Sequence, residues 1–214
     1  MLAAVSRHFA ETARWTGLEK PDQRVLEALR RVPRDRFVPV EQRGAAWEDR
    51  PLEIGSGQTI SQPFVVALLA QLCDCVQGTR VLEIGTGCGY QAAVLAALGA
   101  EVWSIELEPE LAREAALRLA GLRDLEGAPL RIHQRTGDGA LGWPEAAPFA
   151  RIVATAAPVL PPPCWLEQLA APGRLIAPLG PVGGAQMLTV IDKDEDGRLE
   201  QSRVLPVRFV PLRH

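Results

Sequence analysis

The chain has 214 residues, enough to bury one hydrophobic core and too few for two full domains. Its net charge of −3 gives no diffuse basic field, so we expect no nucleic-acid partner. No stretch is apolar over the roughly 18 residues of a membrane helix, and Met1 to Trp15 fits an amphipathic helix better than a signal peptide. We therefore expect a monomeric, cytoplasmic, single-domain protein without a membrane partner, with residues 1–78 as a helical N-terminal part and residues 79–214 as the core.

The first part of the chain predicts helices followed by a polar loop. Hydrophobic periodicity predicts helices over Ala3–Arg14 and Asp22–Arg31. Prolines at positions 33, 39 and 51 then break regular structure. A polar, glycine-rich loop over Gly55–Pro63 leads into an apolar helix over Phe64–Cys73.

Strand and helix patterns alternate in the rest of the chain. This alternation predicts an α/β fold with a doubly wound, mostly parallel sheet covered by helices. The last two strands, joined by a charged turn, predict a β-hairpin at the far edge of the sheet. The predicted strands begin at Val81 and then cover Val102–Glu106, Leu130–Arg135, Ile152–Thr155, Arg174–Pro178, Met187–Ile191 and Arg203–Val210, and the predicted helices cover Tyr90–Leu98, Pro109–Leu119 and Pro163–Leu169.

The segment Val81–Tyr90 is the most informative in the chain, because a short apolar strand runs into three glycines spaced by two. Glycines at such a turn let backbone amides approach a bound nucleotide. A dinucleotide fingerprint needs Gly or Ala where this chain has Tyr90. Glu83 would also repel a pyrophosphate. A cationic cofactor without phosphate, such as S-adenosylmethionine, suits the acid better.

A second acid follows at the end of the next strand. Glu106 lies about 20 positions beyond Gly87, the spacing at which α/β nucleotide folds place an acid on ribose hydroxyls. Simpler alternatives stay open for each residue. Glu83 is then a surface acid, Glu106 only precedes a helix that begins at Pro109, and the glycines only form a turn.

The cysteines and histidines do not favour a metal site or a nucleophilic triad. The four cysteines form neither a metal-binding box nor a disulfide framework. We expect Cys73 and Cys75 to lie on one helix, two positions apart, with diverging side chains. The three histidines are not near a serine or cysteine in an elbow motif, which disfavours hydrolase chemistry.

Three segments together carry a resemblance to a known family. The loop Gly57–Pro63, the strand and turn Val81–Gly87, and the triplet Gly137–Gly139 resemble the protein-L-isoaspartate O-methyltransferases. The glycine turn is shared by many methyltransferases, whereas the upstream Thr-Ile-Ser loop is much more specific. The likeness extends over nearly the full chain through Val32–Arg34, Tyr90–Ala93, Thr155–Ala157, Pro172–Leu175, Gln186 and Phe209–Leu212.

The resemblance implies the fold of the S-adenosylmethionine-dependent methyltransferases and a repair activity. Enzymes of this family methylate the free α-carboxylate of isoaspartyl residues in proteins and peptides, with S-adenosylmethionine as the cofactor. The ester then closes to a succinimide, whose hydrolysis returns some normal Asp. By residue matching, the resemblance implies Ser61 as the active-site residue, Thr59, Ile60 and Val210 near the substrate, and Glu83, Gly85, Thr86, Gly87, Gly89, Glu106, Leu107, Asp138 and Gly139 around the cofactor, with no metal ligand.

The chain departs from the family pattern at two places. The family usually has an acid before its fourth strand, where this chain has Ala150. The residues after Pro63 are the apolar Phe64–Val66, where some relatives carry histidine. The first departure concerns a local polar contact and the second concerns the rim of the substrate groove.

Alternatives remain for single residues and for the function. Ser61 stands before a helix, where serine is commonly an N-cap, and Asp138 lies in an ordinary Gly-Asp-Gly turn. For the whole chain, the nearest rival is a carboxylate methyltransferase acting on aspartate in a modified peptide. A binding module without transfer activity is a second alternative. A nicotinamide oxidoreductase is the weakest, because of Tyr90 and Glu83.

Overall fold

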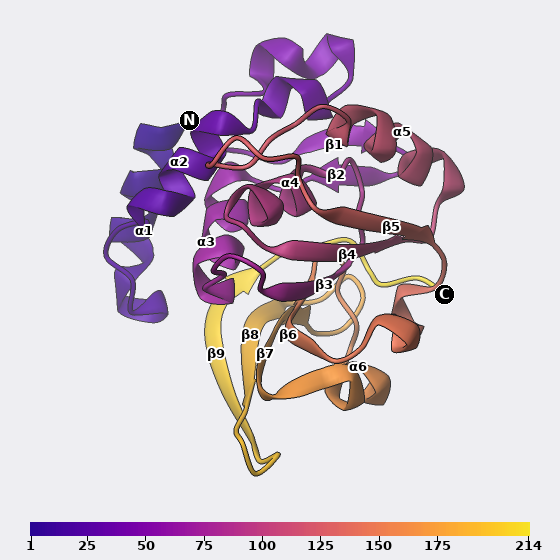
Figure 1. The fold of residues 1–214 in the computed structure, drawn as a ribbon. Helices are drawn as coiled ribbons and strands as arrows, with labels where there is room; N and C mark the ends of the chain where they lie inside the picture. The colour runs from indigo at the N-terminus through magenta and orange to yellow at the C-terminus, as the bar shows by residue number, and fades with distance from the viewer.

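A computed structural model describes residues 1–214 as a seven-stranded sheet flanked by helices, with a separate two-stranded hairpin (Figure 1). The strand order is β5-β4-β3-β6-β7-β8-β9. The helices are α1 (Leu2–Thr16), α2 (Gln23–Arg31), α3 (Pro63–Cys73), α4 (Tyr90–Ala97), α5 (Pro109–Leu119) and α6 (Pro163–Gln168). The strands are β1 (Leu52–Gly55), β2 (Gln58–Ile60), β3 (Arg80–Ile84), β4 (Glu101–Glu106), β5 (Ile132–Thr136), β6 (Phe149–Ala154), β7 (Leu169–Leu179), β8 (Gln186–Lys193) and β9 (Leu199–Val207).

The pairing of the strands confirms the predicted α/β fold. Strands β5, β4, β3, β6 and β7 are parallel, as expected where helices connect them. Strands β8 and β9 add to the sheet in antiparallel pairs, so the predicted C-terminal hairpin lies at the sheet edge. The carboxyl ends of the parallel strands therefore share one edge of the sheet.

Both faces of the sheet are covered by apolar side chains. A cluster of 40 buried residues joins α1 to α4 with one face of the sheet, through side chains such as Val81 and Val102. A cluster of 12 buried residues, including Trp165 of α6 with Leu82 and Ile84, covers the other face. Because side chains alternate along a strand, Glu83 shares the face of Val81 and points under the larger helical layer.

The predicted polar loop before α3 contains a β-hairpin. Strands β1 and β2 pair antiparallel around a turn of Ser56 and Gly57, both of which have positive φ. The sequence interpretation missed these strands because Leu52, Ile54 and Ile60, which are buried in the main core, are separated by polar and glycine residues. The hairpin places the end of β2 directly before α3.

Several strand boundaries differ from those expected, most of all at β7 and β9. Strand β7 starts at Leu169, before the expected start at Arg174, and runs through Pro172. Strand β9 ends at Val207, before the expected end at Val210. Residues 209–212 leave the sheet, and the N–H of Leu212 donates to the carbonyl of Ala157 at 2.9 Å. This bond holds the segment beside the end of β6.

The expected divergence of Cys73 and Cys75 is wrong. Helix α3 ends at Cys73, and Asp74 adopts a left-handed conformation with a φ of 46°. The chain reversal brings the two sulfur atoms to 3.1 Å, and both residues are buried free thiols. The divergence argument assumed a continuing helix, which a left-handed residue does not allow.

No helix in the structure combines the length and the apolar character that crossing a bilayer requires.

Candidate active site

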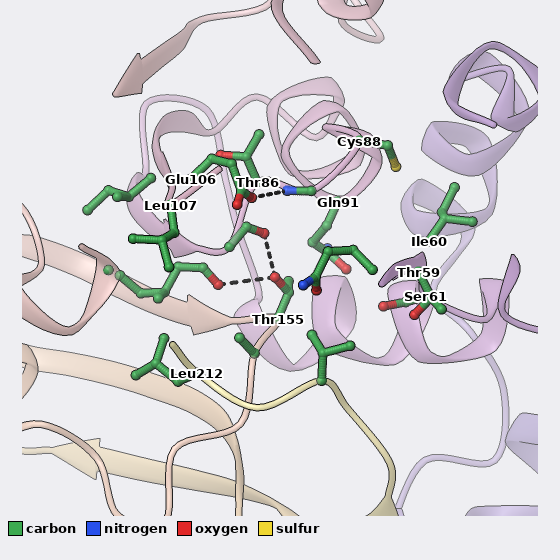
Figure 2. Close-up of a pocket in the computed structure, with 18 of the residues that line it drawn as sticks. Thr59, Ile60, Ser61, Thr86, Cys88, Gln91, Glu106, Leu107, Thr155 and Leu212 are labelled. Atoms are coloured by element: carbon green, nitrogen blue, oxygen red, sulfur yellow. Dashed lines mark hydrogen bonds between the residues drawn. The ribbon is translucent and has the colours of Figure 1, made fainter. Parts of the chain in front are cut away.

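A pocket opens at the carboxyl ends of the parallel strands, where ligands bind in open α/β sheets. Figure 2 shows its side chains converging from segments far apart in the sequence. The lining comprises Gln58, Thr59, Ile60, Ser61, Val66, Ile84, Gly85, Thr86, Gly87, Cys88, Tyr90, Gln91, Ile105, Glu106, Leu107, Gly139, Thr155, Ala156, Val210, Pro211, Leu212 and Arg213. Most of the residues predicted for the site are therefore brought together, and three of them, Glu83, Gly89 and Asp138, are outside this lining.

The glycine turn connects β3 to α4 in a conformation that other residues rarely adopt. Gly85 has a φ of 94°, and a Cβ atom there would lie 2.6 Å from Oγ1 of Thr155. Gly89 has a φ of 91°, and a Cβ atom there would meet the side chain of Leu119 at 3.2 Å. The absence of a side chain at Gly85 thus lets the turn lie close to Thr155 in the pocket wall, whereas the absence of one at Gly89 lets α4 pack against α5.

Glu83 lies beneath the turn and not at the pocket surface. Its side chain is fully buried, so the surface-acid alternative is wrong. Oε2 accepts a hydrogen bond from the hydroxyl of Ser104, and that hydroxyl lies 2.6 Å from Oγ1 of Thr86 in the lining. Burial raises the pKa of the Glu83 carboxyl to about 8, with a further rise from Glu106 and an opposing contribution from Ser104. In this structure the group is therefore largely protonated at neutral pH and connected to the turn through hydroxyls.

Glu106 forms part of the pocket wall and fixes the turn. The residue is 6% exposed, and its carboxylate accepts hydrogen bonds from the N–H of Gly87 at 2.7 Å and of Glu108 at 3.0 Å. The charge therefore faces the pocket at the end of β4, next to Leu107. The bond to Glu108 shows that Glu106 also organises the start of α5, so the two roles considered for it are compatible.

Ser61 stands between the β1–β2 hairpin and α3. The helix cap is Gln62, and the N–H of Phe64 in the first turn is bound by Asp49 at 2.9 Å. The N-cap alternative for Ser61 is therefore wrong. Arg34, which is fully buried, donates from Nη2 to the carbonyl oxygen of Ser61 at 3.0 Å. Arg34 thus fixes the backbone at Ser61, and the Ser61 side chain lines the pocket.

Asp138 and Gly139 follow β5. The Asp138 carboxylate accepts a hydrogen bond from the N–H of Ala140 at 2.8 Å, which is the turn chemistry considered for it. Its Oδ1 also lies 3.5 Å from Nδ1 of His214. Gly139 lines the pocket, and a Cβ atom there would approach Ile84 to 2.6 Å. The adjacent backbone, more than the Asp138 side chain, forms the wall here.

A second pocket of about 520 Å³ adjoins the first. The two share four lining residues, Thr59, Ser61, Thr155 and Val210. The second is otherwise lined by residues such as His8 of α1, Val65 of α3 and Arg208, which directly follows β9. The predicted substrate residues thus stand where the two pockets meet, with Ile60 on the first side only.

The sequence interpretation missed several lining residues. It left Thr155 undecided, yet the Thr155 hydroxyl donates to the carbonyl of Ile84 at 3.1 Å and closes the base of the turn. It made no use of Gln91 as a site residue, although this buried residue in the first turn of α4 has no hydrogen-bond partner at Oε1 or Nε2. A polar residue in the otherwise apolar helix that follows a glycine turn is a signal that identifies Gln91.

The lining fits S-adenosylmethionine better than a dinucleotide. Arg213 is the one cationic side chain in the lining, and it pairs with Glu108 at 2.8 Å, so no cation is free to neutralise a pyrophosphate. The lining also contains the Glu106 carboxylate and the side-chain amide of Gln91, which has no hydrogen-bond partner within the protein. Apolar walls for a base come from Ile84, Ile105, Leu107 and Leu212. No group of three His, Cys, Asp or Glu side chains is arranged to hold a metal ion.

Comparisons with known proteins agree with this geometry. A relative named protein-L-isoaspartate O-methyltransferase from Anaeromyxobacter dehalogenans is 50% identical over 205 residues, which cover 95% of this chain and 96% of the relative. A relative named protein-L-isoaspartate O-methyltransferase 2 from Nitrosococcus oceani is 47% identical over 99% of this chain and 94% of its own length.

Solved structures of the same name share the fold. One, a protein-L-isoaspartate O-methyltransferase, superposes with a TM-score of 0.80 at 25% identity, covering 99% of this chain and 65% of that one. Another is a putative protein-L-isoaspartate O-methyltransferase from Plasmodium falciparum in complex with S-adenosyl-L-homocysteine, with a TM-score of 0.77 at 20% identity, covering 99% of this chain and 98% of that one.

The family model described as protein-L-isoaspartate(D-aspartate) O-methyltransferase matches residues 7–214. Together with relatives about 50% identical over nearly their whole length, this match shows that the chain belongs to the protein-L-isoaspartate(D-aspartate) O-methyltransferase family.

Proposed function

We propose that this protein is a repair enzyme that transfers a methyl group from S-adenosylmethionine to the free α-carboxylate of L-isoaspartyl residues in damaged proteins and peptides. The following backbone N–H attacks the ester, methanol leaves, and the resulting succinimide hydrolyses in part to normal Asp. The observation that carries the proposal is the junction of the two pockets at Thr59 and Ser61, where a cofactor and a polypeptide can meet.

The proposed chemistry explains why the first pocket contains no histidine. When bound, S-adenosylmethionine supplies an electrophilic methyl group on a sulfonium. A peptide carboxylate has a pKa of about 4, so the nucleophile is already ionised at neutral pH and needs no general base. The protein then has to align the two groups and exclude water, because water stabilises the separated charges more than the transition state.

We assign the substrate end of the site to the segment between β2 and α3. Ser61, held from behind by Arg34, orients the substrate carboxylate with its hydroxyl. Thr59, Ile60 and Val210 contact the chain on either side of the isoaspartyl residue. This assignment is supported by their place in the lining and by the polar character of Ser61 and Thr59 at the shared wall.

We assign the cofactor end to the glycine turn and the strand ends beside it. The backbone of Gly85, Thr86 and Gly87 approaches the ligand, Glu106 and Leu107 hold the ribose side, and Gly139 lies at the adenine edge with Asp138 as its support. Gly89 acts through the packing of α4, and Glu83 acts from beneath the turn through Ser104 and Thr86.

Transfer of labelled methyl groups to three matched peptides tests the function. The peptides carry isoaspartate, aspartate, or isoaspartate with a blocked α-carboxylate. We expect transfer to the first only, followed by release of volatile methanol. Preference for the aspartyl peptide would favour the rival carboxylate methyltransferase, and cofactor binding without ester formation would favour the binding module.

We also propose that the enzyme is a monomer in the cytoplasm. Both pockets are built within one chain, and all four cysteines are free thiols, as expected in a reducing compartment. Light scattering of the purified protein tests the first statement, and cell fractionation tests the second.

A further inference from the structure

Gln91 is a buried polar residue without a partner at the wall of the pocket. It is 7% exposed, and neither its Oε1 nor its Nε2 forms an intramolecular hydrogen bond. All residues of α4 are buried, and the only other polar side-chain atom among them is the Tyr90 hydroxyl, which is also buried and without a partner. Buried amides are almost always hydrogen-bonded, because desolvating one without a partner costs free energy. An unpaired amide that lines a pocket therefore indicates a ligand that supplies the missing partners.

The chemistry of the amide restricts the kind of partner. A carboxamide has an acceptor, Oε1, and a donor group, Nε2, and both are unpaired in Gln91. A substrate carboxylate has acceptors only, so it would pair with Nε2 and leave Oε1 unsatisfied. The α-ammonium and α-carboxylate of a free amino acid provide a donor and an acceptor on one carbon atom, which matches both ends of the amide.

The arrangement of the pocket places an amino acid near Gln91. In Figure 2, Glu106 and Leu107 lie on one side of the pocket, Thr59 and Ser61 lie on the other, and Gln91 extends between them. With the ribose at Glu106 and the methyl acceptor at Ser61, the remaining part of the cofactor is its methionine end.

We propose that the Gln91 side chain binds the amino-acid end of S-adenosylmethionine, with Oε1 accepting from the ammonium and Nε2 donating to the carboxylate. The proposal rests on the function proposed above and names a specificity residue for its cofactor. Gln91 then distinguishes the intact cofactor from nucleosides that have lost the amino acid.

Calorimetric binding of two ligands tests the proposal without measuring turnover. S-adenosylhomocysteine keeps the amino-acid end, and 5′-methylthioadenosine lacks it. We expect Gln91→Leu to weaken the binding of S-adenosylhomocysteine by about 10-fold to 100-fold, since hydrogen bonds to two charged groups are lost. The binding of 5′-methylthioadenosine should stay within about twofold. The same variant should melt at a higher temperature without ligand, because leucine replaces an unsatisfied amide.

A matched control is Gln134→Leu. Gln134 also has a buried and unpaired Nε2, but it lies on β5 outside the pocket. We expect this variant to bind both ligands as the unchanged protein does. Loss in the Gln134 variant equal to that in the Gln91 variant would contradict a local role for Gln91.

Other outcomes separate this proposal from the proposed function. Equal weakening of both ligands by Gln91→Leu would overturn the amino-acid assignment, as would unchanged binding of S-adenosylhomocysteine with a raised KM for the isoaspartyl peptide. If the unchanged protein bound neither ligand, the proposed function itself would fail, and the role of Gln91 with it.

Discussion

Ser61 is the residue at which a structural role and a functional role separate most cleanly. Serine before a helix commonly stabilises the helix by capping, but here the N–H of Phe64 donates the capping hydrogen bond to the Asp49 carboxylate. The only hydrogen bond to Ser61 in the structure is at its carbonyl, from Arg34. The hydroxyl is therefore free for a substrate.

We expect Ser61→Ala to lower kcat for an isoaspartyl peptide by about 10-fold to 100-fold, because a misaligned carboxylate reacts slowly. The melting temperature should change by no more than about 1 °C, since no cap is lost. Turnover assays and thermal melts of the same samples measure both. Ser202→Ala, on the exposed side of β9, is the control. A lower melting temperature with intact kcat would refute the catalytic assignment.

Among the elements, helix α3 depends on a partner outside itself. Its own cap residue, Gln62, forms no side-chain cap bond. The Asp49 carboxylate instead binds the N–H of Phe64 with one oxygen and lies 2.5 Å from Nδ1 of His8 with the other. Asp49 thus ties α1 and α3 together next to Ser61.

We expect Asp49→Ala to destabilise the protein by about 1–2 kcal/mol, the usual effect of losing a cap, and also to lower kcat/KM because the Ser61 turn shifts. Asp22→Ala is the matched control, since Asp22 caps α2 through the N–H of Arg24 at 2.7 Å and lies outside both pockets. Urea unfolding and peptide kinetics should show similar stability losses but an activity loss only for Asp49. Equal activity in the two variants would contradict a positioning role.

The elements that the sequence predicted well are those with local signals. Helix α5 was expected over Pro109–Leu119 and is observed there, because a proline starts it and an amphipathic pattern continues to its end. The β1–β2 hairpin and the start of β7 were not predicted. Their polar and proline-containing residues are held in strands by cross-strand bonds and core contacts, which depend on distant parts of the chain.

The site could be predicted in outline for the same reason. Motif spacing predicted that Gly85 and Glu106 lie at one pocket, since neighbouring parallel strands end at one edge, whereas Ser61 was predicted from the family resemblance. The hydrogen bond from Ser104 to Glu83 could not be predicted, because it depends on the register of β3 against β4, which sets these two residues opposite each other. Gln91 could have been singled out as the one polar side chain that interrupts an apolar helix pattern, but its lack of a hydrogen-bond partner is visible only after every neighbour is placed.

For the whole molecule, the buried Glu83 links stability to pH. The carboxyl lies between the central strand β3 and the helical layer, and burial raises its pKa to about 8, against 4.5 for an exposed glutamate. Between these values the folded protein keeps a proton that the unfolded chain has released. The contribution of this group to stability is therefore most favourable below about pH 4.5 and decreases as the pH rises to about 8.

We expect Glu83→Gln to remove the loss of folding stability that Glu83 causes as the pH rises. This loss amounts to a few kcal/mol in the free energy of unfolding between about pH 5 and pH 8. Urea unfolding at several pH values measures it, with the exposed Glu19→Gln as the control. The Glu19 variant should keep the pH dependence of the unchanged protein. A Glu83 variant with the same slope as the unchanged protein would show that the carboxyl is already ionised in the folded state.

The adjacent thiols of Cys73 and Cys75 provide a built-in reporter of opening. Both are shielded at the end of α3, whereas Cys164 is partly accessible. A disulfide-exchange dye added to a Cys88→Ser variant, which lacks the buried thiol of the pocket lining, therefore modifies Cys164 first, and further uptake follows the rate at which the shielded pair becomes transiently accessible. Helix α3 begins beside Ser61 and ends at Cys73. Slower dye uptake by the Cys73 and Cys75 thiols after ligand addition would therefore show that ligand binding at the start of α3 reduces opening at its end.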